Sequence, residues 1–335
     1  MLGPALILAG SYLAVGSGVD IFFLPKLLAI AVGCFLCLSK PSTRTAAPLR
    51  PWFLLGLSVT LLATLTAASP LQAALGLFRS PTAGLLGALA CWLSYEAGCR
   101  SPRASWRYAT WGAGLCAAGA LATWIPGAPF HYMLPSGRAI GTIGSPPFLG
   151  CMLVATLPWV IISAPRAVAS LVFIALLATE SKAAILGAVA GVLVLHTHTM
   201  SRRAVLALSA AGLAGAFLVF ARAGSDTMRL CTWGIAWKAF LMRPWLGWGP
   251  DNFIDAFMQL RGNAWVEAAG NSGMTASENA HNLVLNLLAT QGFLGLCAHL
   301  ALGAVVARSL LARTDRESRC LVACYASVLV YSMFN

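Results

Sequence analysis

The chain has 335 residues, of which 59% are hydrophobic and only 10% are charged, and its net charge is +12. A soluble domain carries roughly 25% charged residues, so this composition argues against a soluble protein. Apolar runs of about membrane-spanning length recur along the chain, and they are continuous rather than alternating, which favours helices over a β-barrel. Anionic lipid headgroups are the expected partners of the excess positive charge. Nucleic-acid binding is not expected, because no basic soluble module is present.

The apolar runs predict an all-α, polytopic integral membrane bundle with about 11 spans. Residues 1–335 are expected to form a single membrane domain. The predicted spans are 2–19, 22–39, 51–68, 81–98, 107–125, 146–163, 165–179, 183–199, 204–221, 283–308 and 319–335. Most of the ten cysteines fall inside these runs, so neither a disulfide framework nor a structural zinc site is expected.

The distribution of Lys and Arg predicts the orientation of the bundle. Most of the 22 Lys and Arg residues lie in short connectors on one side, which the positive-inside bias places in the cytoplasm. These basic connectors are 40–50, 100–107, 166, 202–203 and 308–319. The long loop 222–282 then faces the periplasm or the cell exterior. Positive charges on that side run against the bias, so they are explained either by headgroup contact or by an anionic substrate.

The long loop is expected to carry an amphipathic helix over residues 226–242. Its apolar stripe suits a helix that lies in the membrane interface. The stripe consists of Leu230, Trp233, Trp237, Phe240 and Leu241. Arg229 lies at the edge of this face, and we expect its guanidinium group to meet an anion.

The end of the long loop carries a histidine close to the next predicted span. Residues 275–278 match a capping box, which predicts a helix with His281 in its second turn. An imidazole on the outer side of the membrane suits a general base at neutral pH. The alternative is a histidine that only makes hydrogen bonds at a helix start, and the sequence does not separate the two.

Three further cations lie in predicted outer segments. Lys182 follows Glu180 and Ser181 in a tight helix hairpin, where it either forms an ion pair or offers a charge to a phosphate group. Arg138 precedes a glycine-containing stretch, 141–146, that would allow a ligand to approach the backbone. Arg79 lies in the segment 70–81, which is predicted to re-enter the membrane.

Several short motifs follow one another in the order of a known family. They are Gly76-Leu-Phe-Arg79, Arg138-x-x-Gly-Thr-x-Gly-x-Pro146, Thr179-Glu-Ser-Lys182-Ala, Arg229-x-x-x-Trp233, Pro244-x-x-Gly247-x-Gly249-x-x-Asn252-Phe253, and His281-Asn282 with Gly292-x-x-Gly295. Together they resemble the O-antigen ligase/polymerase superfamily, which includes protein O-oligosaccharyltransferases. The chain departs from the family pattern at Lys182, where arginine is preferred, and at Pro147, where asparagine is usual. Its apolar end at Asn335 suggests that the family's last span or spans are missing.

The resemblance implies a membrane glycosyltransferase with a helical fold like that of the type C glycosyltransferases, located in the bacterial inner membrane. The donor would be a glycan on undecaprenyl diphosphate, and the acceptor would be lipid A core, a growing polysaccharide such as O-antigen, or a protein. Transfer would take place on the outer side and invert the anomeric configuration. No cofactor and no metal would be required, because the protein supplies the positive charge.

The same resemblance assigns roles to the candidate residues. Arg229 and Lys182 would stabilise the charge that develops on the diphosphate leaving group, and His281 would accept the proton of the acceptor hydroxyl. The residues expected to bind the diphosphate or the sugar are Arg138, Arg79, Asn252, Asn282 and Glu278.

Two other functions remain open from the sequence. A transporter or flippase for anionic lipid-linked sugars would share the outer cations, although no inverted repeat is evident. A non-catalytic subunit of a membrane assembly is the third hypothesis.

Overall fold

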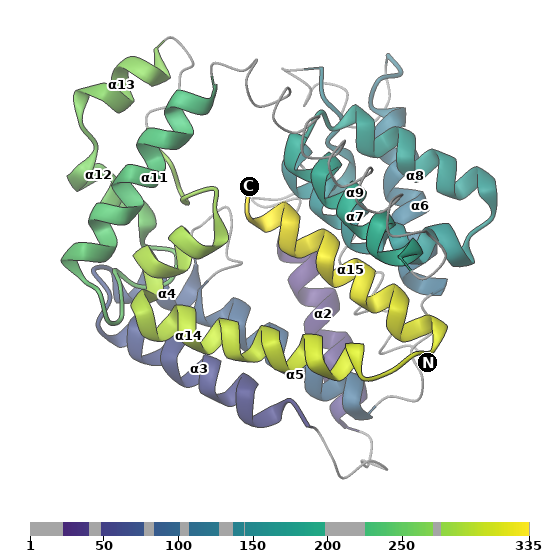
Figure 1. Cartoon of the computed structure of the whole chain (residues 1–335), viewed down its shortest axis with the longest axis horizontal. Coiled ribbons are helices and arrows are strands. Elements are labelled where there is room, and N and C mark those ends of the chain that lie inside the picture. Colours follow the sequence, from purple (N-terminus) through teal and green to yellow (C-terminus); the bar gives the residue numbers. More distant parts are fainter. Residues whose placement is uncertain are drawn as a thin grey trace. The chain divides into compact units, whose positions relative to one another are not determined.

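A computed structural model describes residues 23–39, 48–76, 84–100, 107–126, 137–143, 145–197, 225–270 and 276–334. These residues form thirteen α-helices and one 3-10 helix, and they contain no strand (Figure 1). In chain order they are α2 (Phe23–Leu38), α3 (Arg50–Leu65), α4 (Pro70–Leu75), α5 (Leu85–Arg100), α6 (Arg107–Ala122), η2 (Gly141–Ile143), α7 (Pro146–Ser163), α8 (Arg166–Ala178), α9 (Lys182–His196), α11 (Ser225–Met242), α12 (Phe253–Leu260), α13 (Asn263–Ala269), α14 (Leu283–Leu311) and α15 (Arg316–Ser332).

The predicted all-α class is confirmed. Nine of the predicted apolar runs coincide with helices to within a few residues, and the other two, 2–19 and 204–221, lie outside the described residues. By length and composition, α7 and α14 are sufficient to cross a bilayer, while α3, α8 and α9 are shorter apolar helices. The count of about 11 spans and the outward orientation of the loop 222–282 stay predictions.

The chain divides into two compact units. The first unit consists of Met1–Thr45, Ser94–Phe217 and Ser309–Tyr331, and the second consists of Ala46–Leu93, Leu218–Arg308 and Ser332–Asn335. Each unit therefore contains segments that are distant in sequence. The expected single membrane domain over residues 1–335 stays a prediction.

The first unit is built around α6, α7, α8 and α9, which lie side by side in Figure 1. Helix α7 contacts the other three, so it forms the centre of this group. Small residues allow the helices to approach closely: a Cβ at Gly187 on α9 would lie 2.6 Å from the Ser327 carbonyl oxygen on α15. The same two helices meet α7 in a core that contains Trp159, Leu195 and Cys320.

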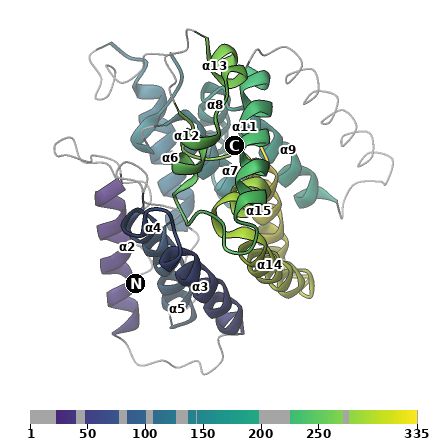
Figure 2. The same cartoon turned by 90° about the vertical axis from the view of Figure 1, so that its left-hand side faces the viewer.

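The second unit contains α11, against which α12 and α13 pack (Figure 2). Its core includes Phe253 and Phe257 of α12 and Trp265 of α13, and the Phe257 and Trp265 rings meet edge to face with centroids 4.9 Å apart. The Trp265 Nε1–H group donates to Thr232 Oγ1 on α11 at 3.1 Å. This hydrogen bond satisfies a buried indole and fixes α13 against α11.

The predicted loop helix 226–242 is confirmed as α11. The leucines and the second tryptophan of its predicted apolar stripe are exposed: Leu230 is 62% exposed, Trp237 48% and Leu241 59%. The opposite face is buried through small and branched residues, including Ile235 and Ala236. An exposed apolar face is the arrangement expected of a helix at a membrane interface.

Candidate functional site

Lys182 is the first residue of α9 and follows a tight turn from α8. The turn is held by Thr179, whose buried Oγ1 donates to the Leu176 carbonyl at 2.7 Å and accepts from the Ser181 amide at 3.2 Å. Ser181 then caps α9, because its Oγ accepts from the Ala184 amide at 3.3 Å. The half-buried Lys182 side chain is thus carried on a fixed backbone at a helix N-terminus.

Arg138 lies at the same end of the first unit as the Lys182 turn. Its Nε donates to the Thr179 carbonyl at 2.8 Å, and the neighbouring Ala139 amide donates to the Ala178 carbonyl at 2.9 Å. The guanidinium group is therefore tied to the residue that begins the turn. The structure brings together these two sequence-predicted cations.

The N-terminal turns of α7 and α9 also lie together at this end. A Cβ at Gly150 on α7 would lie 2.7 Å from the Ala184 Cβ on α9, so the two helix starts are in close contact. Helix N-termini carry partial positive charge and favour anions. We call Lys182, Arg138 and these two helix starts the cationic corner.

Pro147, a departure from the family pattern, lies in the first turn of α7. A helix start does not need the amide hydrogen that proline lacks, so the substitution fits this position. The Pro147 carbonyl accepts a hydrogen bond from the Tyr331 hydroxyl at 2.8 Å. In this chain the position ties α7 to the end of α15.

His281 lies in the second unit, in the turn before α14. The prediction that it belongs to the second turn of a helix is wrong, because α14 begins at Leu283 and Asn282 caps it by accepting from the Leu285 amide at 3.0 Å. The Asn279 side chain accepts from the His281 amide at 2.8 Å, which holds the backbone in a turn instead. Asparagine side chains compete with helical hydrogen bonds in this way.

Arg229 on α11 acts electrostatically on His281. Burial, and then the Arg229 guanidinium, lower the pKa of His281 from 6.5 to about 4. Both causes disfavour the imidazolium form, so His281 is neutral at neutral pH. A neutral imidazole has a free nitrogen lone pair that can accept a proton, so the arrangement supports the predicted pairing of an arginine with a general base.

The other predicted polar residues of the second unit have different surroundings. Glu278 is exposed, and Asn282 is half-buried with its Nδ2 donating to the Met333 carbonyl at 3.0 Å. Asn252 is 0% exposed, and its Nδ2 donates to the Ser69 carbonyl at 3.1 Å. These contacts make Asn252 part of the loop framework, while substrate contact by all three stays a prediction. Arg79 lies outside the described residues.

The glycine-rich stretch that follows α11 inserts its backbone into a kink of α14. The kink is at Gly292, where φ is 66° and ψ is −165°. Amides 248 and 249 donate to carbonyls 289 and 290 at 2.9 and 2.8 Å, and amides 293 and 294 donate to carbonyls 244 and 245 at 2.7 and 3.2 Å. We call this set of hydrogen bonds the backbone clamp.

The glycines of the clamp are required by its geometry. At Gly247, where φ is +66°, a Cβ would lie 2.6 Å from the Gln291 amide nitrogen. At Gly292 a Cβ would lie 2.6 Å from the Leu246 amide nitrogen. The clamp therefore fixes the end of the Arg229 helix against the helix that follows His281, and it gives a structural reason for Gly247 and Gly292 in their two motifs.

Three residues other than glycine have a positive φ among the described residues, and all lie in the motifs selected from the sequence. They are Glu180, Asp251 and His281, with φ values of 50°, 54° and 51°. Such backbone costs energy and concentrates at functional sites, so it supports these turns as candidate site elements.

Sequence reasoning missed the contacts that hold the 248–255 segment. Ser69 Oγ donates to Asp255 Oδ2 at 3.0 Å, and Gln72 Nε2 donates to the Asp251 carbonyl at 2.8 Å. It also missed α12, although apolar residues at positions 253, 256, 257 and 260 have helical spacing and were a usable signal. The contacts with Ser69 and Gln72 have no such signal, because their partners are almost two hundred residues apart.

Comparison with known proteins gives one family match, over part of the chain. No curated protein matches the chain. Residues 167–300 match the family model described as O-Antigen ligase. The matched region contains the Lys182 turn, Arg229, the backbone clamp and His281, so it confirms the resemblance drawn from the motifs. Together with the apolar helices, it indicates a bacterial integral membrane protein. The match therefore supports the similarity of residues 167–300 to the O-antigen ligase/polymerase superfamily.

Proposed function

We propose that this protein is a membrane glycosyltransferase that moves a glycan from an undecaprenyl-diphosphate donor to an acceptor hydroxyl. The acceptor is lipid A core, a growing polysaccharide or a protein. The reaction takes place on the periplasmic side of the bacterial inner membrane. The observation that carries the proposal lies inside the region matched by the O-Antigen ligase model: His281 is held in a turn where burial, and then the nearby Arg229 charge, lower its pKa.

In the proposed reaction, His281 removes the proton from the acceptor hydroxyl. The acceptor oxygen then forms a bond to the anomeric carbon of the donor sugar, and the bond between that carbon and the phosphate oxygen breaks. The electron pair leaves with polyprenyl diphosphate, whose charge Arg229 and Lys182 stabilise. A single displacement of this kind inverts the anomeric configuration.

A bound anionic substrate is expected to raise the pKa of His281 and so to make it a stronger base. In the absence of an anion, burial and Arg229 hold the pKa of His281 at about 4. A bound diphosphate would neutralise part of the guanidinium field, so the pKa of His281 would rise toward its ordinary value. The histidine would then be neutral before the substrate binds and more basic once it has bound, which favours proton transfer only in the loaded site.

The proposal is tested with Arg229→Ala and His281→Ala in purified protein. We expect each substitution to lower transfer by about 10²–10⁴-fold, because a charge stabiliser or a general base is lost. The measurement is formation of glycosylated acceptor from labelled lipid-linked donor in detergent, where no sealed compartment exists. Lys238→Ala, at an exposed position on the same helix, is the matched control and should retain activity.

Near-normal transfer by both Arg229→Ala and His281→Ala would rule out the proposed mechanism. Movement of donor across sealed vesicles, without product in detergent, would instead identify a flippase. Mass analysis of surface glycans with and without the gene would then identify the acceptor.

A further inference from the structure

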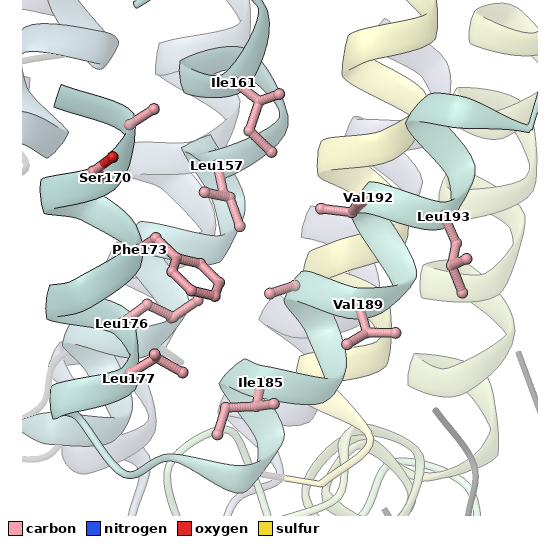
Figure 3. Close-up of a pocket in the computed structure, with 12 residues that line it drawn as sticks. Leu157, Ile161, Ser170, Phe173, Leu176, Leu177, Ile185, Val189, Val192 and Leu193 are labelled. Atoms are coloured by element: carbon pink, nitrogen blue, oxygen red, sulfur yellow. The ribbon is translucent and has the colours of Figure 1, made fainter. Parts of the chain in front are cut away.

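Helix α8 borders two hollows of the first unit. One is an apolar groove between α8 and α9, in which Ser170 is the one polar side chain among the twelve residues that line it (Figure 3). The other hollow, of about 290 Å³, lies where α7 ends and α8 begins, and α6 packs against both helices there. The residues that line it are Thr110, Trp111, Ser163, Ala164, Pro165 and Val168. We call this second hollow the hydroxyl pocket, and it lies at the opposite end of α8 from the Lys182 turn.

The two hydroxyl groups of the pocket are committed as donors within the chain. Ser163 Oγ donates to the Trp159 carbonyl at 2.6 Å, and it lies 3.3 Å from Thr110 Oγ1. Because the hydrogen of Ser163 is used in the first bond, the Thr110 hydroxyl is the donor in the second. A ligand that reaches these oxygens therefore meets lone pairs, and it has to supply the hydrogens itself.

The turn from α7 into α8 is also poor in donors. The Ala164 amide donates to the Val160 carbonyl at 2.9 Å, the Val168 amide donates to the Pro165 carbonyl at 3.0 Å, and proline has no amide hydrogen. Trp111 adds an aromatic ring to the lining, and the face of such a ring attracts cations. Hydroxyl lone pairs beside an indole ring suit a ligand that donates hydrogen bonds and carries positive charge, such as a primary ammonium group.

Two arginines flank the pocket and require an anion as well. Arg166 follows Pro165 as the first residue of α8, and its side chain is exposed. Arg316, the first residue of α15, donates from Nη2 to the Ile162 carbonyl at 2.9 Å, directly beside Ser163. A guanidinium group has five N–H donors, so Arg316 retains others for a phosphate. These cations would repel an isolated amine, whereas a ligand with both an ammonium and a phosphate group satisfies the pocket and its rim.

An apolar strip on α6 leads away from the pocket. Trp111 is 54% exposed and Leu115 is 72% exposed, and residues four apart lie on the same face of a helix. A membrane lipid has acyl chains that can cover such a strip, and a tryptophan beside polar groups is typical of the membrane interface. The strip therefore favours a lipid over a small soluble phosphate.

We propose that the hydroxyl pocket binds the head group of an ethanolamine phospholipid. The ammonium group donates to the oxygens of Ser163 and Thr110 and lies against Trp111, and the phosphate pairs with Arg166 and Arg316. The site is separate from the cationic corner and has no part in the proposed transfer reaction, so the inference does not rest on the proposed function.

The experiment measures lipid binding to the delipidated full chain in detergent by native mass spectrometry. The probes are phosphatidylethanolamine, phosphatidylcholine, which keeps both charges but has no N–H group, and phosphatidylglycerol, which has no ammonium group. Ser163→Ala removes an acceptor from the pocket. Ser170→Ala is its matched control, because Ser170 is an exposed serine on α8 that lines the apolar groove instead (Figure 3). Thermal unfolding establishes that both variants are folded.

We expect the wild type to bind phosphatidylethanolamine at least about tenfold more tightly than phosphatidylcholine or phosphatidylglycerol, because hydrogen bonds to a charged group are lost with either. Ser163→Ala should remove most of the preference over phosphatidylcholine, and Ser170→Ala should keep it. Arg316→Gln should weaken both zwitterionic lipids about equally, since each has the phosphate. Arg319→Gln removes a charge from another exposed position of α15 and should change neither.

Equal binding of phosphatidylethanolamine and phosphatidylcholine by the wild type would overturn the inference, whatever the variants do. Tighter binding of phosphatidylglycerol would show that the arginines alone attract the lipid, and it would also reject the ammonium site. Displacement of the lipid by an equal concentration of soluble glycerophosphoethanolamine would overturn the assignment to a membrane lipid. A preference that Ser163→Ala leaves intact would place the lipid outside the hydroxyl pocket.

Discussion

The two groups of candidate residues are positioned by different means: the cationic corner in the first unit, and the Arg229–His281 pair in the second unit. Lys182 and Arg138 are positioned by regular helices, a capped turn and a close contact in which Gly150 meets a side chain. Arg229 and His281 depend on irregular backbone, in which Gly247 meets the backbone of another segment at a positive φ. The first arrangement should tolerate small changes in side chains, whereas the second should fail when its backbone is altered.

The largest effect is expected from Gly247→Ala, which tests whether the second unit depends on its backbone geometry. Since its Cβ would lie 2.6 Å from a backbone nitrogen and φ is +66°, we expect loss of folded protein, with destabilisation on the order of 3 kcal/mol or more. Thermal unfolding and size-exclusion chromatography in detergent measure the effect. Gly234→Ala and Gly262→Ala are the matched controls, because a Cβ at either position meets nothing within 4 Å.

A Gly247→Ala protein that unfolds at the wild-type temperature would show that the backbone clamp is not required. If the controls were destabilised equally, the effect would come from any added methyl group in the loop. Either result would remove the distinction between the two units.

A second prediction concerns the titration of His281. Burial and Arg229 lower the pKa of His281 to about 4, so Arg229→Gln should raise it toward 6.5, and burial should keep it below that value. Histidine NMR signals measured across pH report this change without any transfer assay. Lys238→Gln removes a cation from an exposed position of α11 and should leave the His281 titration in place.

The same shift sets how stability and activity depend on pH. The pKa of His281 is lower in the folded protein than its ordinary 6.5, so folding is favoured by this group above pH 6.5. That contribution is lost as the pH falls toward 4. Because the base must be neutral, kcat/KM should also fall on the acid side near pH 4. An Arg229→Gln protein whose His281 titrates as in the wild type would contradict the proposed pairing.

The smallest expected effect is at the cap of the Lys182 turn. Ser181→Ala removes the acceptor for the Ala184 amide and should cost about 1 kcal/mol of stability, while the helix and the charge of Lys182 remain. Chemical unfolding measures the loss, and the transfer assay should show a reduced rate rather than none. Complete inactivation would show that the cationic corner also depends on fine backbone placement.

The candidate residues were largely accessible from the sequence, but their environments were not. Arg229, His281 and Lys182 could be selected because charged groups are rare in an apolar chain and therefore conspicuous. Asn252 was selected for substrate contact, yet it is fully buried with its amide bonded to Ser69. Nothing in the local sequence indicates a bond between residues so far apart.

The helix that was predicted to contain His281 shows the same limit. A capping-box pattern favours a helix start at residues 275–278, and local propensity gave no reason to place it later. Three asparagine side chains decide otherwise, because Asn279 and Asn286 accept from backbone amides of the turn and Asn282 caps α14. When several side chains could cap a helix, the one that does so depends on which backbone amides the rest of the unit leaves without a hydrogen bond.

By itself, the sequence determined the all-helical class, the positions of most helices and the motifs of the family, because these follow from apolar run length and from short local patterns. Only the tertiary structure decided that Gly247 and Gly292 meet across a kink, that Arg138 holds the Lys182 turn, and that burial, with a smaller effect of Arg229, lowers the pKa of His281. These properties depend on close approach and burial between segments remote in sequence, and a linear pattern contains neither.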